Sequence, residues 1–318
     1  MISDKDIQAA VEQLSAGNLV AFPTETVYGL GADALNALAV AKIFELKKRP
    51  SFDPLIVHIH SLEQINELVV NLDTRVEKLA SAFWPGPLTI IMEKSSIVPD
   101  IVTAGLSTVG IRMPSNPVAI QLLKAFNKPI AAPSANMFGK VSPTKAEHVT
   151  SKLEGVEMVL DGGPVSVGIE STIVQLLDDG FKILRPGFIT YEDISSVIPA
   201  SSDLSKDEVI APGMVKSHYS PDVYLKLIDS IDEVTQSDAV NAAIIPFKSE
   251  SGLDKFKIVK RLSANDDLKE YAVNIFSALH ELQDENIEAI YVEKIPEEGL
   301  GLAIMDRLKK AAYRFTVE

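Results

Sequence analysis

The sequence predicts an α/β protein in which a large, open, twisted mixed sheet with helices is followed by a smaller second α/β domain. Short apolar runs typical of strands alternate with segments whose apolar residues recur at the 3.6-residue period of a helix. Some runs are separated only by a tight turn, such as residues 178–180, so the strands that they join must be antiparallel. The 318 residues exceed the roughly 150 of a typical domain, which predicts two domains.

The segment 19–59 predicts a strand, a polar turn, a helix and a second strand. The apolar run at 19–22 stops at Pro23, and the hydroxyls and carboxylate that follow predict a turn closed by glycines within 24–31. Asn36 is a suitable N-cap for a helix that ends in three cations before Pro50. The second strand is expected at residues 55–59.

The remaining elements of the first domain, expected at residues 1–200, follow the same alternation. Helices are predicted over residues 4–15, 61–70, 73–83 and 116–126. Strands are predicted over residues 88–92, 108–112, 130–132, 158–160, 171–177 and 181–184.

A serine-rich, acidic stretch then leads into APGMVKSHYSPD, which predicts a linker over residues 201–222. Beyond it, strands are predicted over residues 223–228, 242–246, 257–261 and 289–293, and helices over residues 231–236, 268–282 and 301–313. This order predicts a small Rossmann-like domain over residues 223–318. Because it has no G-x-G-x-x-G motif, that likeness predicts no dinucleotide site.

Composition excludes several functional classes. The chain has no cysteine, which rules out disulfides, thiolate zinc sites and a cysteine nucleophile. Its net charge of −14 argues against an extended nucleic-acid surface, although a local basic pocket remains compatible with it. The sequence has neither an apolar signal core nor an apolar run long enough to span a bilayer, so we expect a cytoplasmic protein.

No Walker P-loop occurs, so a nucleotide would have to be held by separate groups from several loops. The candidates are Lys47-x-Arg49, Ser134-x-Asn136, Ser171-Thr172 and Arg185. Each is also compatible with a purely structural role, because cations favour helix C-termini and serine and asparagine favour turns.

Arg112 ends an apolar strand, where an unpaired arginine is costly. Its partner could be a substrate carboxylate or a distant acid. His58 and His60 face the same way on one strand, but no third metal ligand is evident, so His58 is preferred as a substrate contact. Asp53 and Glu25 could form a carboxylate pair for acid–base chemistry, or could be ordinary loop acids.

Several motifs in order resemble the YrdC-type threonylcarbamoyl-AMP synthases in their long two-domain form. They are FPTETVYGLG, Lys47-x-Arg49 with Ser134-x-Asn136, VGIRMP, SANxxGxxSPT, GxxSTIV, LRPG and PGMxxxHYxP. The resemblance covers almost the whole chain and implies a YrdC-like catalytic domain, a linker with the PGM and HYSP motifs, and a Rossmann-like C-terminal domain.

The resemblance implies a nucleotidyltransferase that joins L-threonine, bicarbonate and ATP into threonylcarbamoyl-AMP and releases pyrophosphate. Mg²⁺ would enter with ATP rather than occupy a site built by the protein alone. The product would pass to a tRNA threonylcarbamoyl-transfer complex that modifies the adenosine next to the anticodon. No membrane association and no stable direct contact with nucleic acid are expected.

The same resemblance implies the residues of the site. Lys47 and Arg49 would be catalytic. The ATP side would consist of Lys47, Arg49, Asp53, Thr108, Ser134, Asn136, Ser142, Arg185 and Tyr219. The threonine side would consist of Thr26, His58, Arg112, Ala132, Ser171 and Thr172. Two positions depart from the family pattern: Asp53 replaces the usual asparagine, and Ala132 stands where relatives can carry a hydroxyl.

Two other functions remain open from the sequence. An RNA-binding, translation-associated module could use a concave basic cavity, although the acidic balance opposes it. A carbamoyl-transfer enzyme that uses carbamoyl phosphate would share the catalytic fold, but such relatives normally carry further segments that this chain lacks.

Overall fold

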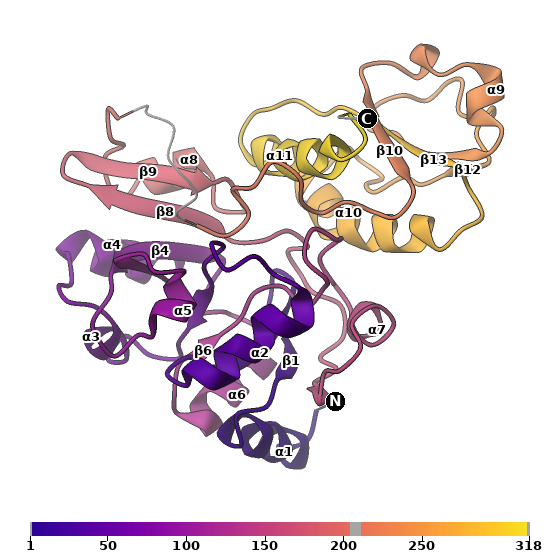
Figure 1. Ribbon diagram of the computed structural model, residues 1–318. Coiled ribbons are helices and arrows are strands. Elements are labelled where there is room, and N and C mark those ends of the chain that lie inside the picture. Colours follow the sequence, from indigo (N-terminus) through magenta and orange to yellow (C-terminus); the bar gives the residue numbers. More distant parts are fainter. Residues whose placement is uncertain (1, 204–210, 317–318) are drawn as a thin grey trace.

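The computed structural model describes residues 2–203 and 211–316, which contain two separate sheets (Figure 1). The strands of the first sheet are β1 (Val20–Pro23), β2 (Tyr28–Asp33), β3 (Ile56–His58), β4 (Leu88–Glu93), β5 (Thr108–Arg112), β6 (Ile130–Ala131), β7 (Met158–Val159), β8 (Thr172–Leu177) and β9 (Gly180–Arg185). Their order is β7-β1-β2-β6-β3-β5-β4-β8-β9. Parallel and antiparallel pairs both occur, as the sequence predicts.

The helices of the first part are mostly short and lie around this sheet (Figure 1). They are α1 (Asp4–Ser15), α2 (Ala37–Lys47), α3 (Ile65–Leu68), α4 (Thr74–Phe83), α5 (Asp100–Thr103), α6 (Pro117–Phe126), α7 (Ala146–Thr150) and α8 (Tyr191–Ser195). Asn36 caps α2 through its side chain, and Asn116 caps α6 in the same way. Both caps were expected from the sequence.

The helix predicted over residues 61–70 is wrong in extent, because only Ile65–Leu68 is helical. The chain leaves the helix to pair with the end of β4. Val70 N donates to Glu93 O at 3.1 Å, and Val69 forms a bridge with Lys94. Strand pairing therefore overrides the local helical pattern.

The polar turn predicted within residues 24–31 also needs correction, since β2 begins at Tyr28 and forms a hairpin with β1. Glycines normally weaken strands, but here they admit close packing. A Cβ on Gly31 would lie 2.8 Å from the Phe22 ring and 2.9 Å from Ile130. Only glycine allows β2 to pass between these side chains.

The C-terminal part contains a purely parallel four-stranded sheet in the order β10-β13-β11-β12. Its strands are β10 (Tyr224–Ile228), β11 (Ala242–Ile245), β12 (Ile258–Val259) and β13 (Ala289–Glu293). Its helices are η1 (Ile231–Glu233), α9 (Gln236–Ala239), α10 (Leu268–Gln283) and α11 (Leu300–Tyr313). The helix predicted over residues 231–236 is instead the two short pieces η1 and α9.

The two parts share one apolar cluster. Loop residues of the first part, including Val27 and Ile169, pack with Tyr219 of the linker against α10 and α11. Packing is tight at Gly168, where a Cβ would lie 2.3 Å from the carbonyl oxygen of Ala272. Residues 204–210, within the predicted linker, lie outside the described residues, whereas 211–222 run along this contact.

Candidate active site

A small cavity lies where several segments of the first part meet the linker. Its walls come from the β1–β2 hairpin, from the ends of β3, β5, β6 and β9, and from the linker around Pro212 and Tyr219. Its volume is about 50 Å³. Sites for small ligands usually measure roughly 300–1,000 Å³, so the linker occupies space that a large ligand would need.

His58 and Arg112 stand together at one wall because β3 and β5 are parallel neighbours. The register pairs His58 with Arg112, and both residues end their strands. Carboxyl ends of parallel strands meet at one edge of a sheet, which is where such folds usually bind ligands. Both side chains line the cavity and are buried.

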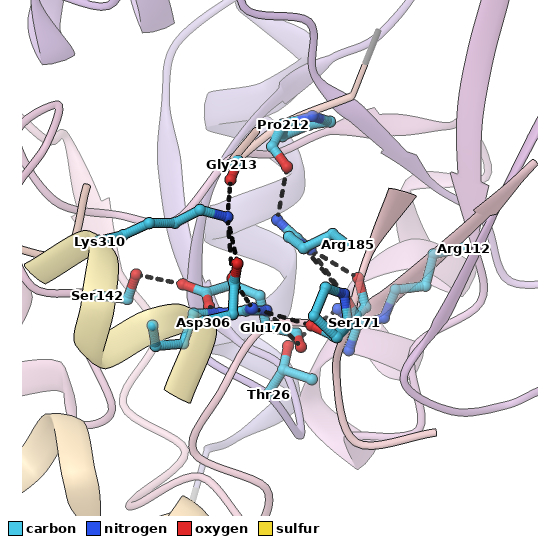
Figure 2. A network of polar contacts seen from close by, with 12 residues as sticks. Thr26, Arg112, Ser142, Glu170, Ser171, Arg185, Pro212, Gly213, Asp306 and Lys310 are labelled. Carbon is cyan, nitrogen blue, oxygen red and sulfur yellow. Dashed lines mark hydrogen bonds and ion pairs between the residues drawn. The ribbon is translucent and has the colours of Figure 1, made fainter. Parts of the chain in front are cut away.

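Arg112 has two protein partners. Its Nη1 donates to Thr26 Oγ1 at 2.9 Å, and its Nη2 lies 2.6 Å from Glu25 Oε1 in a buried ion pair. Figure 2 shows Arg112 and Thr26 at the edge of the polar network. The distant acid considered from the sequence is thus Glu25. The Nε of Arg112 makes no hydrogen bond to the described residues and remains a donor for a ligand.

His58 is held neutral. Burial, assisted by the positive charge of Arg112, lowers the pKa of its imidazole to about 3. Its Nδ1 is buried and has no hydrogen-bond partner among the described residues, and its ring meets Phe22 edge to face. A neutral ring beside a cation can contact a substrate without repelling it.

Arg49 also lines the cavity, and its guanidinium is fixed by the chain that follows it. Its Nε donates to Asp53 O at 3.0 Å, its Nη2 donates to Pro54 O at 2.8 Å, and Nη2 lies 2.9 Å from Asp53 Oδ1. Burial raises the pKa of the Asp53 carboxyl, while the charges of Arg49 and Lys47 oppose that rise. Glu25 and Asp53 therefore each pair with a different arginine rather than with each other.

Lys47 does not line the cavity but lies directly behind it. It is 1% exposed, and its Nζ donates to Ser134 O at 2.6 Å and to Asn136 O. Burial, reinforced by the nearby charge of Arg49, lowers its pKa well below the usual value. The Lys47-x-Arg49 and Ser134-x-Asn136 motifs are thus in contact, because Lys47 binds the backbone of the Ser134–Asn136 loop. Ser134 of that loop lines the cavity.

Arg185 joins the wall to the linker. Its Nε and Nη2 donate to Ser171 O at 3.1 and 3.0 Å, and Nη2 also reaches Ser171 Oγ at 3.1 Å. Its Nη1 donates to Pro212 O at 3.1 Å, as Figure 2 shows. Ser171 Oγ in turn lies 2.8 Å from Thr89 Oγ1, so the wall is fixed from both sides.

Tyr219 closes the cavity from the linker. It is fully buried, adopts a positive φ of 63°, and stacks on Phe276 of α10 with 5.4 Å between ring centroids. Its hydroxyl makes no hydrogen bond to the described residues. Gly213 allows this fit, because a Cβ there would lie 2.9 Å from the Tyr219 hydroxyl.

The predicted site residues divide into two groups by position. Those that line the cavity are Thr26, Arg49, His58, Arg112, Ala132, Ser134, Ser171, Arg185 and Tyr219. Those behind or away from it are Lys47, Asp53, Thr108, Asn136, Ser142 and Thr172. Thr108 begins β5, at the opposite end from Arg112, and Thr172 Oγ1 donates to Ile189 O at 2.6 Å.

Glu170 and His218 also line the cavity and were missed by the sequence reasoning. Both stand directly beside chosen residues, Glu170 before Ser171 and His218 before Tyr219. The available signal was the motif itself, since an acid and an imidazole within such motifs are chemically conspicuous.

Comparisons with known proteins match both parts of the chain. A family model described as telomere recombination (Sua5, YciO, YrdC) matches residues 12–187. A model described as the threonylcarbamoyl-AMP synthase C-terminal domain matches residues 189–313. A Pyrococcus abyssi protein named threonylcarbamoyl-AMP synthase is 41% identical over 98% of this chain and 95% of its own. A Bacillus subtilis protein of that name is 41% identical over 98% of this chain and 94% of its own.

The chain belongs to the threonylcarbamoyl-AMP synthase family.

A crystal structure of P. abyssi Sua5 in complex with L-threonine superposes with a TM-score of 0.88 at 39% identity, covering 98% of this chain and 96% of that one. A Mycobacterium tuberculosis relative, named a putative threonylcarbamoyl-AMP synthase, is 38% identical but covers only 61% of this chain. The present chain is therefore a synthase of the long form, with the C-terminal domain. Among the described residues, no helix is long and apolar enough to cross a membrane.

Proposed function

We propose that this synthase joins L-threonine, bicarbonate and ATP into threonylcarbamoyl-AMP and releases pyrophosphate. The observation that carries the proposal is that Arg49, Arg185, Arg112 and His58 all line one cavity. Two of these arginines, Arg49 and Arg185, suit a triphosphate, and Arg112 beside a neutral histidine suits an amino acid. The L-threonine bound to the P. abyssi relative supports the second half.

On the threonine side, the substrate carboxylate would take the free Nε of Arg112. The Glu25 ion pair and the Thr26 hydroxyl fix the orientation of that guanidinium in advance. Neutral His58 would accept or donate a single hydrogen bond without adding charge. Holding the α-carboxylate rigidly leaves the amine free to lose a proton and capture CO₂. The resulting N-carboxylate would then attack the α-phosphate, from which pyrophosphate leaves, along a line set by the fixed α-carboxylate.

On the ATP side, Arg49 and Arg185 would neutralise the phosphates and the charge that develops at the α-phosphorus. Lys47 would act mainly by holding the Ser134–Asn136 loop. In the described residues no group of three or more His, Cys, Asp or Glu side chains could hold a metal ion. Mg²⁺ is therefore proposed to arrive with the triphosphate, which it would help to neutralise.

The linker would have to withdraw before ATP enters, because a cavity of about 50 Å³ is too small for a nucleotide. Its return would then exclude water from a carbamate and a mixed anhydride, both of which hydrolyse readily. We further propose that the released product passes to a tRNA threonylcarbamoyl-transfer complex and that the enzyme works in the cytoplasm.

Threonine-dependent release of pyrophosphate from ATP and bicarbonate tests the proposal. Wild-type enzyme should release pyrophosphate only when threonine is present, and should form the threonylcarbamoyl adduct of AMP. Carbamoyl phosphate should not replace bicarbonate. Equal activity with carbamoyl phosphate, or no adduct at all, would contradict the assignment.

Replacing Arg49 by methionine should lower kcat/KM for ATP by about 10²–10³, the usual effect of removing one group that stabilises a developing negative charge. The matched control is Lys48→Met, which removes an adjacent but exposed cation and should leave turnover unchanged. Near-normal pyrophosphate release by Arg49→Met would refute the role assigned to Arg49.

A further inference from the structure

We propose that Arg307 of α11 is a positioning residue through which the C-terminal domain holds the ATP-side wall of the cavity in its working geometry. This gives the C-terminal domain a part in catalysis, although no residue of α11 lines the cavity. The inference rests on the proposed function, since it concerns how the enzyme binds and uses ATP.

Arg307 is fully buried and reaches out of its own domain. Its Nε donates to Glu170 Oε2 at 2.8 Å, its Nη1 donates to Pro186 O at 2.9 Å, and its Nη2 approaches Glu170 O at 3.4 Å. Its guanidinium carbon lies 5.4 Å from the centre of the Tyr219 ring, at cation–π distance. One side chain thus contacts Glu170, the residue that follows Arg185, and the Tyr219 ring that closes the cavity.

These contacts flank the interaction between Arg185 and Ser171. Glu170 immediately precedes Ser171, and Pro186 immediately follows Arg185. Arg307 therefore fixes one chain neighbour of each member of the pair that points Arg185 into the cavity. A shift of Arg307 would move both ends of that contact together.

Glu170 is the ion-pair partner of Arg307. It lines the cavity, and its Oε1 accepts a hydrogen bond from Ser142 at 2.5 Å (Figure 2). Burial alone would raise its pKa, but the charges of Arg307 and Arg185 and the bond from Ser142 hold the pKa below its ordinary value. Glu170 thus stays ionised, shares charge with both arginines, and links α11 to the predicted ATP residue Ser142.

Lys310, one turn further along α11, holds the linker. Its Nζ donates to Gly213 O at 2.7 Å and pairs with Asp306 at 2.8 Å, and its carbonyl accepts from His218 N at 3.2 Å. Arg185 reaches the same linker segment from the opposite side through Pro212 O. Through Arg307 and Lys310, a single helix, α11, therefore contacts both the cavity wall and the linker that closes the cavity.

Stability alone is a weak reason for such a pair. A buried ion pair often contributes no more stability than apolar residues of the same volume, because both charges lose their hydration. Apart from its ion pair with Asp306 at 2.7 Å on the same helix, the contacts of Arg307 concentrate on residues that line the cavity or neighbour those that do. What these contacts share is that each of them fixes the position of residues at the proposed ATP site.

The test uses full-length Arg307→Lys, Arg307→Met and the double variant Glu170→Gln/Arg307→Met. We expect kcat to fall at least tenfold and KM for ATP to rise several-fold in each, because small displacements of a positioned group are costly. KM for threonine should rise less than KM for ATP, since Arg307 does not touch Thr26, His58 or Arg112 and reaches the threonine side only through the neighbour of Ser171. Arg307→Lys should recover part of kcat.

The double variant guards against simple misfolding, because it removes both charges of the buried Arg307–Glu170 ion pair rather than one of them. If the two residues act as one unit, the double variant should be no slower than Arg307→Met. Lys309→Met is the control: it removes an exposed cation two residues away on α11 and should change neither constant. Activities are compared below the unfolding temperature of each variant, measured by circular dichroism.

Two results would overturn the inference: unchanged kcat in a variant that is folded but less stable, or a rise in KM for threonine equal to that for ATP. Failure of the proposed function is distinguishable, because it would appear as missing threonine-dependent pyrophosphate release in wild-type enzyme. If wild type is active and the Arg307 variants match it, only the role of Arg307 is refuted.

Discussion

At the scale of single residues, the site contains two arginine–carboxylate pairs that differ in how many arginine donors remain free for a ligand. Arg112 with Glu25 leaves one donor free, so the pair orients a ligand-binding group. Arg49 with Asp53 is more fully engaged, because two backbone carbonyls also accept from the guanidinium. A triphosphate that approaches Arg49 therefore meets a buried carboxylate beside it.

Replacing Asp53 by asparagine should lower KM for ATP by about tenfold. The Asp53 carboxylate would repel the phosphates of ATP. At an effective dielectric of about 20, unit charges 4 Å apart repel by about 4 kcal/mol. Because Asp53 would lie further than that from the phosphates, we expect about 1.4 kcal/mol, which corresponds to a tenfold change in affinity. The asparagine oxygen can still meet Arg49. Steady-state kinetics with varied ATP measure the change, with exposed Asp100→Asn as control. An increase in KM would indicate instead that Asp53 assists Mg²⁺.

At the scale of elements, packing constrains the backbone of the described part of the linker, residues 211–222. Gly213 has a φ of 79°, which favours glycine, and its α-carbon sits against Arg185 and Tyr219. Tyr219 itself has positive φ and is retained by stacking on α10 and by Arg307. Closure thus depends on a few tight contacts.

Gly213→Ala should weaken closure. A left-handed backbone costs an L-residue about 1–2 kcal/mol, and the new methyl would also press on Tyr219. ATP should enter more readily, so its KM should fall, while less adduct survives for each pyrophosphate released. Chromatography of the adduct against a pyrophosphate assay gives that ratio. Gly252→Ala, with a φ of 71° in an exposed loop, is the control; equal ratios in both variants would contradict a covering role for the linker.

At the scale of the whole molecule, both parts and the linker contain a buried histidine whose protonation affects stability. His58 lies in the first sheet, His218 in the linker, and His280 on α10, where its Nε2 donates to Ser142 O at 3.1 Å. Burial lowers the pKa of all three, to about 3 for His58 and about 4 for His280. The folded state therefore keeps the rings neutral while the unfolded chain binds protons below pH 6.5.

The resulting stability is present above pH 6.5 and is lost as the pH falls from 6.5 towards 4. Each histidine should reduce the free energy of unfolding by about 1.4 kcal/mol per pH unit, or about 2 kcal/mol by pH 5. Urea denaturation at pH 7.5 and 5.0 measures the loss. His280→Gln keeps a donor for Ser142 O and should lose about 2 kcal/mol less than wild type; an equal loss would refute the assignment.

The sequence by itself did not predict β2, α5, α7 or α8, but it determined most of the strands and longer helices, the mixed first sheet, the Rossmann-like second part and the family. Local signals suffice there, because caps, turns and hydrophobic periods act over a few residues. The helix at 61–70 and the turn at 24–31 were mispredicted, since pairing of Val69 with Lys94 and packing of Ile130 on Gly31 involve distant partners.

Only the tertiary structure decided which predicted residues face the cavity and which support it. Lys47 and Arg49 are two residues apart, yet one holds a loop from behind while the other lines the wall. Arg307 carried no sequence signal, because Glu170 and Pro186, its partners in the first part, lie more than a hundred residues away. Burial and charge pairing are set by the folded neighbours of a side chain, and those neighbours are brought together only by folding.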